Sequence, residues 1–63
     1  MSFLAARERA GKTQTEVARH MEVTTGAISQ WENGISAPKI ERLKKLAAFY
    51  GCTVDELLKE DTT

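Results

Sequence analysis

The chain has 63 residues, enough for one domain at most, and 41% of them are hydrophobic and 29% charged. A chain this short buries only about 60% of the surface that its unfolded form exposes, so we expect a small stability. The composition is that of a compact domain and excludes a fibrous or disordered chain. The single cysteine, Cys52, excludes an internal disulfide, and the most apolar stretch, residues 46–50, is too short for a membrane helix. We therefore expect a cytoplasmic protein without a signal peptide.

Charge is distributed unevenly along the chain, although the nine basic and nine acidic residues cancel. Residues 1–52 hold eight basic and five acidic side chains, a net charge of +3, and residues 53–63 hold one and four, a net charge of −3. A strongly basic total would by itself indicate a nucleic-acid partner. The asymmetry points in the same direction, but only weakly.

Glycine and hydroxyl residues recur at helix-length intervals, and no window shows the period-two alternation of a half-buried strand. The sequence therefore predicts an all-α fold of five helices in a single domain over residues 1–60. Ser2 is placed to cap a first helix over residues 3–10, and Gly11 follows where a left-handed residue commonly ends a helix. Arg7 falls within the apolar stripe of this helix.

The second helix is predicted over residues 14–21, because Thr13 and Glu16 have the spacing of a capping box. Only Glu22 and Val23, plus a capping residue, join it to the next helix. A link this short does not allow a relaxed antiparallel hairpin, so the two helices are expected to cross at the steep angle of a helix-turn-helix.

The third helix is predicted over residues 25–33, with Thr24 as its N-cap and Gly34 after its end. Val23 and Ile28 occupy the two positions of a hydrophobic staple, which fixes the angle at which the chain enters the helix.

A fourth helix is predicted to end at Gly51, with Pro38 in or just before its first turn. Its start is left open, because either Ser36 or Lys39 can occupy the cap position. Thr53 and Glu56 form a second capping box, which predicts a short fifth helix through Leu58 or beyond. We expect residues 61–63 to fray.

The third helix has two contrasting sides. At about 100° per residue, Ile28 and Trp31 fall on one side and face the core. The opposite side, here called the outer face, is uncharged and consists of Thr25, Gly26, Ser29, Gln30 and Asn33. An ordinary solvated face would usually carry lysine and glutamate.

A helix that presents such a face can enter the major groove of DNA, where each base pair shows a distinct pattern of donors and acceptors. Gln30 is the best candidate for a base contact, because its amide can bond an adenine through two atoms. Thr25 and Ser29 are more tolerant, since a hydroxyl both donates and accepts. Gly26 has no side chain and lets the backbone approach closely.

The sequence resembles the Cro/cI-type helix-turn-helix regulators, also called XRE-like, over about residues 3–58. The matching runs are Thr13-Gln14-Thr15-Glu16-Val17-Ala18, Val23-Thr24, Ala27-Ile28-Ser29, Trp31-Glu32-Asn33-Gly34, Pro38, Leu43, Leu46-Ala47 and Asp55-Glu56-Leu57-Leu58. The resemblance implies a five-helix repressor-type DNA-binding domain, of bacterial or phage origin, that acts as a homodimer on a palindromic operator.

The resemblance also implies roles for individual residues. It places Thr24, Thr25, Gly26 and Gln30 nearest the base edges, and we expect Ser29 to join them. Gln14 resembles a residue that touches a phosphate and steadies the third helix, and Asn33 and Lys39 match positions that contact the DNA backbone. Arg7 and Glu32 match an inward ion pair between the first and third helices.

The basic residues apart from Arg7 form a mixed set, of which we expect some to face phosphates and the rest to be solvated. Besides Lys39, the candidates for phosphate contacts are Lys12 and Arg19. The whole set is Arg9, Lys12, Arg19, Lys39, Arg42, Lys44 and Lys45.

The chain departs from the family pattern at two positions. Glu22 stands where a turn glycine is usual, so it must adopt a strained left-handed conformation, at a cost of about 1–2 kcal/mol, or adjust the turn. The same carboxylate adds negative charge near the presumed DNA side. Lys12 stands where relatives often have an apolar residue. These departures bear on affinity more than on the fold.

Several residues have structural interpretations beside the functional ones. Thr24 is favoured as a cap over a base contact, although one hydroxyl can serve both. His20 and Glu16 are one turn apart, but two ligands do not make a metal site, and we expect a solvated histidine. Cys52 is expected to be a buried, inert thiol. Phe49 lies outside the apolar stripe of the fourth helix, and two interpretations stay open: a dimer interface with Leu58, or packing under the fifth helix.

The favoured function is a sequence-specific regulator that binds double-stranded DNA, most simply a repressor that occludes a promoter. The alternative is a protein-interaction module with the same fold, for example an antitoxin-like partner binder, which the neutral charge and Glu22 favour. We expect no enzyme, because the sequence offers no paired carboxylates, no nucleophile with a base and no phosphate-binding loop. We also expect no cofactor, metal, small-molecule ligand or membrane contact.

Overall fold

The computed structural model describes residues 2–59, and these form five α-helices without a strand. The helices are α1 (Phe3–Arg9), α2 (Gln14–Met21), α3 (Thr25–Glu32), α4 (Ile40–Tyr50) and α5 (Val54–Leu58). The all-α, five-helix prediction is confirmed, and the predicted bounds of α1, α2 and α3 lie within one residue of the observed ones. The fraying expected for residues 61–63 and the domain end at residue 60 lie outside the described residues.

Local side-chain chemistry sets most of the helix starts. Ser2 Oγ accepts a hydrogen bond from the Ala5 amide at 3.0 Å and so caps α1. The capping boxes of α2 and α5 are both formed: Thr13 and Glu16 exchange side-chain-to-backbone hydrogen bonds, and Thr53 and Glu56 do the same. Each box satisfies two backbone amides that a helix start leaves unpaired.

The start of α4 differs from the other four. Lys39, not Ser36, occupies its N-cap position, and this lysine makes no side-chain cap hydrogen bond. Pro38 immediately precedes the cap, where the fixed φ of proline suits the approach to a helix. The ambiguity between Ser36 and Lys39 is thereby resolved.

The turn between α2 and α3 contains a strained residue. Glu22 is the C-cap of α2 with φ 58° and ψ 43°, the left-handed conformation that glycine adopts most easily. It is the sole non-glycine residue with a positive φ among residues 2–59. Of the two possibilities for Glu22, the structure shows the strained one rather than an adjusted turn.

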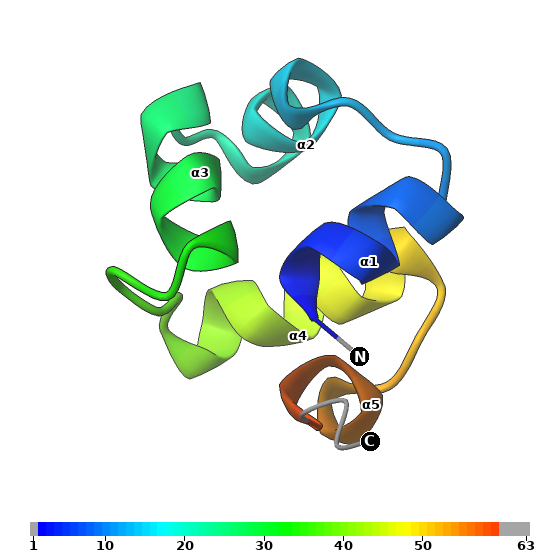
Figure 1. The fold of residues 1–63 in the computed structure, drawn as a ribbon. Helices are drawn as coiled ribbons and strands as arrows, with labels where there is room; N and C mark the ends of the chain where they lie inside the picture. Colours follow the sequence, from blue (N-terminus) through cyan, green and yellow to red (C-terminus); the bar gives the residue numbers. More distant parts are fainter. Residues whose placement is uncertain (1, 60–63) are drawn as a thin grey trace.

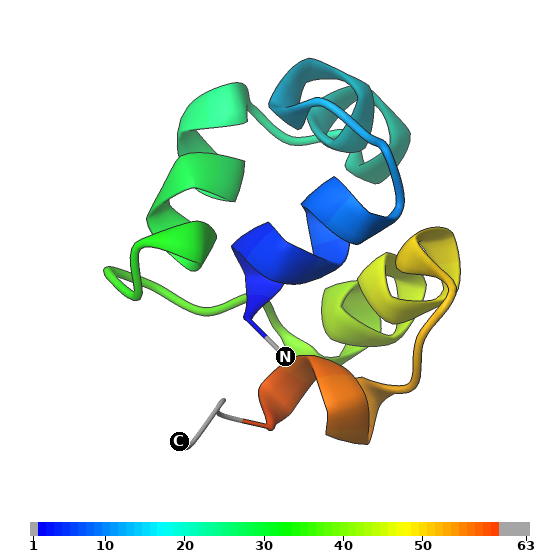
Figure 2. The same cartoon turned by 45° about the vertical axis from the view of Figure 1, so that its right-hand side comes forward.

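One hydrophobic core joins all five helices. Its most buried side chains come one from each of α2, α3, α4 and α5: Val17, Ile28, Leu46 and Leu57. In Figure 1, α2 and α3 form one end of the molecule, α1 and α4 cross its middle, and α5 closes the other end. Figure 2 shows the first turn of α1 beside α5, in agreement with the packing of these two helices. The core thus holds α3 at the edge of the molecule with one side free.

Candidate nucleic-acid interface

The helix-turn-helix formed by α2 and α3 fixes the position of α3. Thr24 Oγ1 accepts a hydrogen bond from the Ala27 amide at 3.1 Å, so the threonine is the cap of α3 as predicted. Val23 is partly buried and packs against the core to which the fully buried Ile28 belongs, which is compatible with the predicted hydrophobic staple. With its start capped and its entry angle fixed, α3 has little freedom to rotate about its own axis.

The two sides of α3 differ in exposure as the sequence predicted. Trp31 is 7% exposed and Ile28 is 1% exposed, and both anchor the helix from inside. On the outer face, Thr25, Gly26, Gln30 and Asn33 are exposed and Ser29 is half-buried. The chain therefore offers a polar, uncharged helix face to a binding partner.

The chain's own packing does not require a glycine at position 26. A Cβ atom built there would meet only Thr24 Oγ1, at 3.7 Å, which is an ordinary contact. Gly26 also has no positive φ that would call for glycine. The absence of a side chain is thus compatible with the close approach of an external molecule.

Three hydrogen bonds involve side chains of the outer face. Asn33 Nδ2 donates to the Ser29 carbonyl at 2.9 Å and to Ser29 Oγ at 3.2 Å. Ser36 Oγ donates to Gln30 Oε1 at 3.4 Å, which is long for a hydroxyl donor, so another partner can replace it. The Asn33 amide is engaged within its own helix end, whereas the Gln30 amide nitrogen points to no partner among residues 2–59.

An ion pair ties α1 to the end of α3, as the resemblance implied. Arg7 Nε donates to Glu32 Oε2 at 2.6 Å, and Arg7 Nη2 donates to Glu32 Oε1 at 3.3 Å. The Glu32 side chain is 6% exposed and the Arg7 side chain 15%. The hydrogen bond to Glu32 raises the pKa of Arg7 above its ordinary value, so the guanidinium stays charged.

Two further hydrogen bonds extend this pair into a network. Arg7 Nη1 donates to the Lys12 carbonyl at 3.0 Å, and Gln14 Nε2 donates to Glu32 Oε1 at 3.0 Å. Gln14 is the first residue of α2 and Glu32 the last of α3. The predicted steadying of the third helix by Gln14 is therefore visible as a direct contact between the two helices.

Phe49 makes a contact that neither interpretation of the sequence included. Its ring stacks on the His20 ring of α2, with centroids 3.9 Å apart and planes 10° from parallel, and Lys12 Nζ lies 5.1 Å from the centroid of the Phe49 ring. Phe49 is half-buried and packs against the core, and the exposed His20 is not simply solvated because its ring stacks on Phe49. The contact joins segments far apart in the sequence, so no local pattern signals it.

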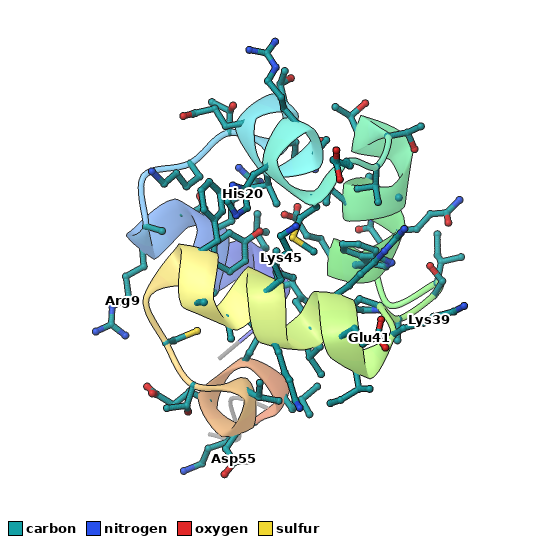
Figure 3. The ribbon with its side chains drawn as sticks, turned by 180° about the vertical axis from the view of Figure 1, so that it is seen from behind. Arg9, His20, Lys39, Glu41, Lys45 and Asp55 are labelled. Carbon is teal, nitrogen blue, oxygen red and sulfur yellow. The ribbon has the colours of Figure 1, made fainter. Side chains whose placement is uncertain are left out.

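The candidate phosphate contacts are not equally placed. Lys12 holds its ammonium group over Phe49, whereas Arg19 and Lys39 are exposed. Figure 3 shows Lys39 at the end of α4 that faces α3, distant from Arg9 and Asp55. Leu58, the other candidate for a dimer interface, is 55% exposed.

Residues 2–59 contain no group of three His, Cys, Asp or Glu side chains that could hold a metal ion, and none of their helices is long and apolar enough to cross a membrane. Cys52 was expected to be buried but is a half-buried free thiol; burial raises its pKa, which favours the less reactive protonated form.

Comparison with known proteins identifies the family. A helix-turn-helix family model matches residues 4–57. Over 52 residues the chain is 44% identical to the HTH-type transcriptional activator BcrR of Enterococcus faecalis, a match that covers 79% of this chain and 26% of BcrR. It is 38% identical over 50 residues to the cryptic phage CTXphi transcriptional repressor RstR of Vibrio cholerae, covering 79% of this chain and 45% of RstR.

A third relative is the HTH-type transcriptional regulator ImmR of Bacillus subtilis (strain 168), 34% identical over 56 residues, which cover 89% of this chain and 44% of ImmR. The chain thus spans less than half the length of each of these relatives, and no solved structure gives a significant match. All three names describe regulators of transcription and none an enzyme, in agreement with the expectation from the sequence. The chain belongs to the helix-turn-helix family of Cro/cI-type, or XRE-like, regulators.

Proposed function

We propose that this chain is a sequence-specific, double-stranded DNA-binding regulator of transcription that inserts α3 into the major groove. The observation that carries the proposal is the contrast between the two sides of α3, with Ile28 and Trp31 buried behind an exposed, uncharged outer face. Uncharged donors and acceptors suit base edges, because they distinguish base pairs by hydrogen-bond pattern rather than by charge. The names of the relatives support the same function.

The base contacts are assigned to the outer face and to the cap that precedes it. Gln30 is the main candidate, since its amide nitrogen is free and its carbonyl is bound only by the loose Ser36 contact. Thr25 and Ser29 supply hydroxyl groups, and Gly26 allows the DNA to approach the backbone. Thr24 caps α3 with one lone pair of its hydroxyl and keeps its proton available for a base.

The phosphate contacts surround this face. Gln14 and the start of α2 bind one phosphate, because the capping box leaves the backbone amides of Gln14 and Thr15 unused and the bond to Glu32 uses only one hydrogen of the Gln14 side-chain amide. Lys39 and Arg19 add positive charge. Asn33 binds a phosphate when its side-chain amide exchanges the Ser29 carbonyl for a phosphate oxygen. Lys12 binds a phosphate only if its ammonium group leaves the Phe49 ring. These contacts fix position and orientation but carry no sequence information.

Two copies of the domain on a palindromic operator complete the proposal. Recognition helices of a dimer lie about 34 Å apart, one turn of DNA. The longest dimension of the domain is 31 Å, so a spacing of this size is compatible with two copies that lie side by side. Leu58 is proposed to contribute to the contact between the copies, whereas Phe49, covered by His20, contributes less. Repression is the simplest mode of regulation for such a dimer, because a dimer that covers a promoter excludes polymerase without an effector.

Selection of bound duplexes from a random pool tests the function and yields the operator. Gln30→Ala is expected to relax the preference at one base position in each half-site, and an unchanged sequence preference would remove Gln30 from the base contacts. Lys39→Ala is expected to weaken binding to all sequences alike. An effect of Lys39→Ala on the selected operator alone would contradict its phosphate role.

A protein-interaction module is the second candidate function. It is favoured by the zero net charge, by the exposed Glu22 carboxylate beside the start of α3, and by the exposed apolar side chains Ile35 and Ile40. A salt series separates the two functions. A DNA-binding domain loses affinity steeply as salt rises, because phosphate contacts release counterions, whereas an interaction module binds duplexes little at any salt concentration.

A further inference from the structure

The hydroxyl group of Ser29, on the outer face of α3, is held by a neighbouring side chain. Asn33, the C-cap of α3, lies one helical turn further along the chain. Its side-chain nitrogen Nδ2 donates to the Ser29 carbonyl at 2.9 Å and to Ser29 Oγ at 3.2 Å, both ordinary hydrogen-bond distances. Asn33 therefore holds the Ser29 side chain in a rotamer that directs Oγ toward the end of the helix.

This hydrogen bond sets the direction in which the Ser29 hydroxyl can act. A hydroxyl has one proton to donate and two lone pairs that accept. In Ser29 one lone pair receives the Asn33 amide, whereas the proton reaches no acceptor among residues 2–59, not even the Thr25 carbonyl one turn earlier. Accepting a hydrogen bond also polarises a hydroxyl toward donation. Ser29 thus acts as a donor toward an external molecule.

Thr25, the other hydroxyl residue of the outer face, provides the contrast. It is exposed, and its hydroxyl makes no hydrogen bond with any described residue. The Thr25 hydroxyl can therefore rotate and either donate or accept. Figures 1 and 2 show α3 along one edge of the molecule, so a partner can approach this helix without displacing another. The two hydroxyl groups of the outer face differ in the chemistry that they can recognise.

We propose that Asn33 is a positioning residue for base recognition, which makes Ser29 a donor and so directs it to a base that offers an acceptor in the major groove. The proposal rests on the proposed DNA-binding function and deepens it by naming the class of base. In the major groove guanine presents two acceptors, adenine and thymine present one each, and cytosine presents a donor alone. The base that Ser29 faces should therefore be guanine in preference to cytosine.

This role is compatible with the phosphate contact proposed for Asn33. The side-chain amide has two hydrogens, so one can move from the Ser29 carbonyl to a phosphate while the other stays on Ser29 Oγ. Asn33 then links a backbone contact to a base contact. The two roles differ in their consequences, because a phosphate contact carries no sequence information. A change in base preference therefore reports the positioning role alone.

Selection of bound duplexes from a random pool tests the proposal. Ser29→Ala identifies the base position that Ser29 faces, because the preference relaxes there. Asn33→Asp is the decisive variant, since its carboxylate takes the Ser29 proton and leaves only lone pairs toward the base. At the identified position, the preference for guanine over cytosine should fall by about 2- to 12-fold, the range of one hydrogen bond, or reverse. Asn33→Ala frees the hydroxyl to act either way and should give an intermediate preference.

The double variant Ser29→Ala/Asn33→Asp is the matched control. It carries the same added negative charge and the same altered helix end as Asn33→Asp, but it has no hydroxyl to redirect. Its base preference should equal that of Ser29→Ala, although its affinity for all duplexes should be lower because the carboxylate repels phosphates.

The outcomes separate this inference from the function on which it rests. A shift in preference caused by Asn33→Asp at the Ser29 position, and absent from the double variant, supports the proposal. Equal weakening of all duplexes, a shift that persists in the double variant, or a wild-type preference for cytosine at that position overturns it. No effect of Ser29→Ala at any position also overturns it, while DNA binding stands. If the wild-type protein selects no duplex, the proposed function and this inference fail together.

Discussion

The network around Glu32 allows a quantitative prediction. Arg7→Met removes three hydrogen bonds and leaves the Glu32 carboxylate, which is 6% exposed, with Gln14 as its one remaining donor. Removing one partner of a buried pair costs 3–5 kcal/mol, and because Arg7 itself is 15% exposed we expect the lower end, about 3 kcal/mol. A 63-residue domain has a total stability of roughly 3–9 kcal/mol. Arg7→Met should therefore lose between about a third and all of that stability.

The assay is thermal and urea unfolding followed by circular dichroism. A loss of about 3 kcal/mol corresponds to a fall in Tm of roughly 12–24 °C in a domain of this size. The double variant Arg7→Met/Glu32→Leu, which leaves no unpaired carboxylate, should recover much of the loss. The reasoning is refuted if Arg7→Met costs less than about 1 kcal/mol, or if the double variant is as unstable as the sum of the two single variants.

Three further predictions concern single side chains. Glu22→Gly should raise the free energy of unfolding by about 0.5–1 kcal/mol, because relief of the left-handed strain exceeds the entropy cost of glycine. Urea titration is the measurement, and a lower midpoint for the variant than for the wild type would contradict this prediction. Burial raises the pKa of Tyr50 to about 12, so the fold favours the neutral phenol and stability is lost as pH rises from 10 to 12. Tyr50→Phe should therefore make the fall in Tm at alkaline pH less steep. An identical fall in the wild type and the variant would exclude Tyr50 as its cause. Hydrogen bonds from Thr13 lower the pKa of Glu16 below its ordinary 4.5. The stability that the Glu16 carboxylate contributes is therefore present above pH 4.5 and is lost as pH falls through the lowered pKa. Glu16→Gln should keep the capping box and make stability less sensitive to acid, which acid titration of both proteins checks.

Local chemistry explains why the helices could be predicted. Thr13 with Glu16 and Thr53 with Glu56 are complete signals within four residues, and both boxes are formed. The two sides of α3 follow from helical periodicity, and the burial of Trp31 confirms them. The Arg7–Glu32 pair joins residues 25 positions apart, and only the resemblance to a family pointed to it.

Contacts between distant segments explain what could not be predicted. The stacking of Phe49 on His20 depends on how α4 crosses α2, which no periodicity in either helix specifies. The same contact draws Lys12 toward the ring and away from a free surface position. The groove between α3 and the start of α4, which Ala27, Trp31 and Pro38 line, likewise arises from the path of the loop after Gly34. Two cations of this groove, Lys39 and Arg42, are 3 residues apart in the sequence. That they lie near Gln30 is evident only from the contact between the Ser36 hydroxyl and the Gln30 side chain.

The zero net charge is compatible with DNA binding because of where the charges lie. Two of the acidic side chains, Asp55 and Glu56, belong to α5, at the far end of the fold from α3, and the outer face of α3 has no charge of its own. Under the proposed function, affinity for any duplex is expected to depend on the few cations beside that face, such as Lys39, since non-specific binding is mainly a matter of phosphate contacts. We expect a domain with few such contacts to bind random DNA weakly. The proposed function then assigns discrimination between sites to the hydrogen bonds of α3, a helix that Trp31 and the Arg7–Glu32–Gln14 network anchor.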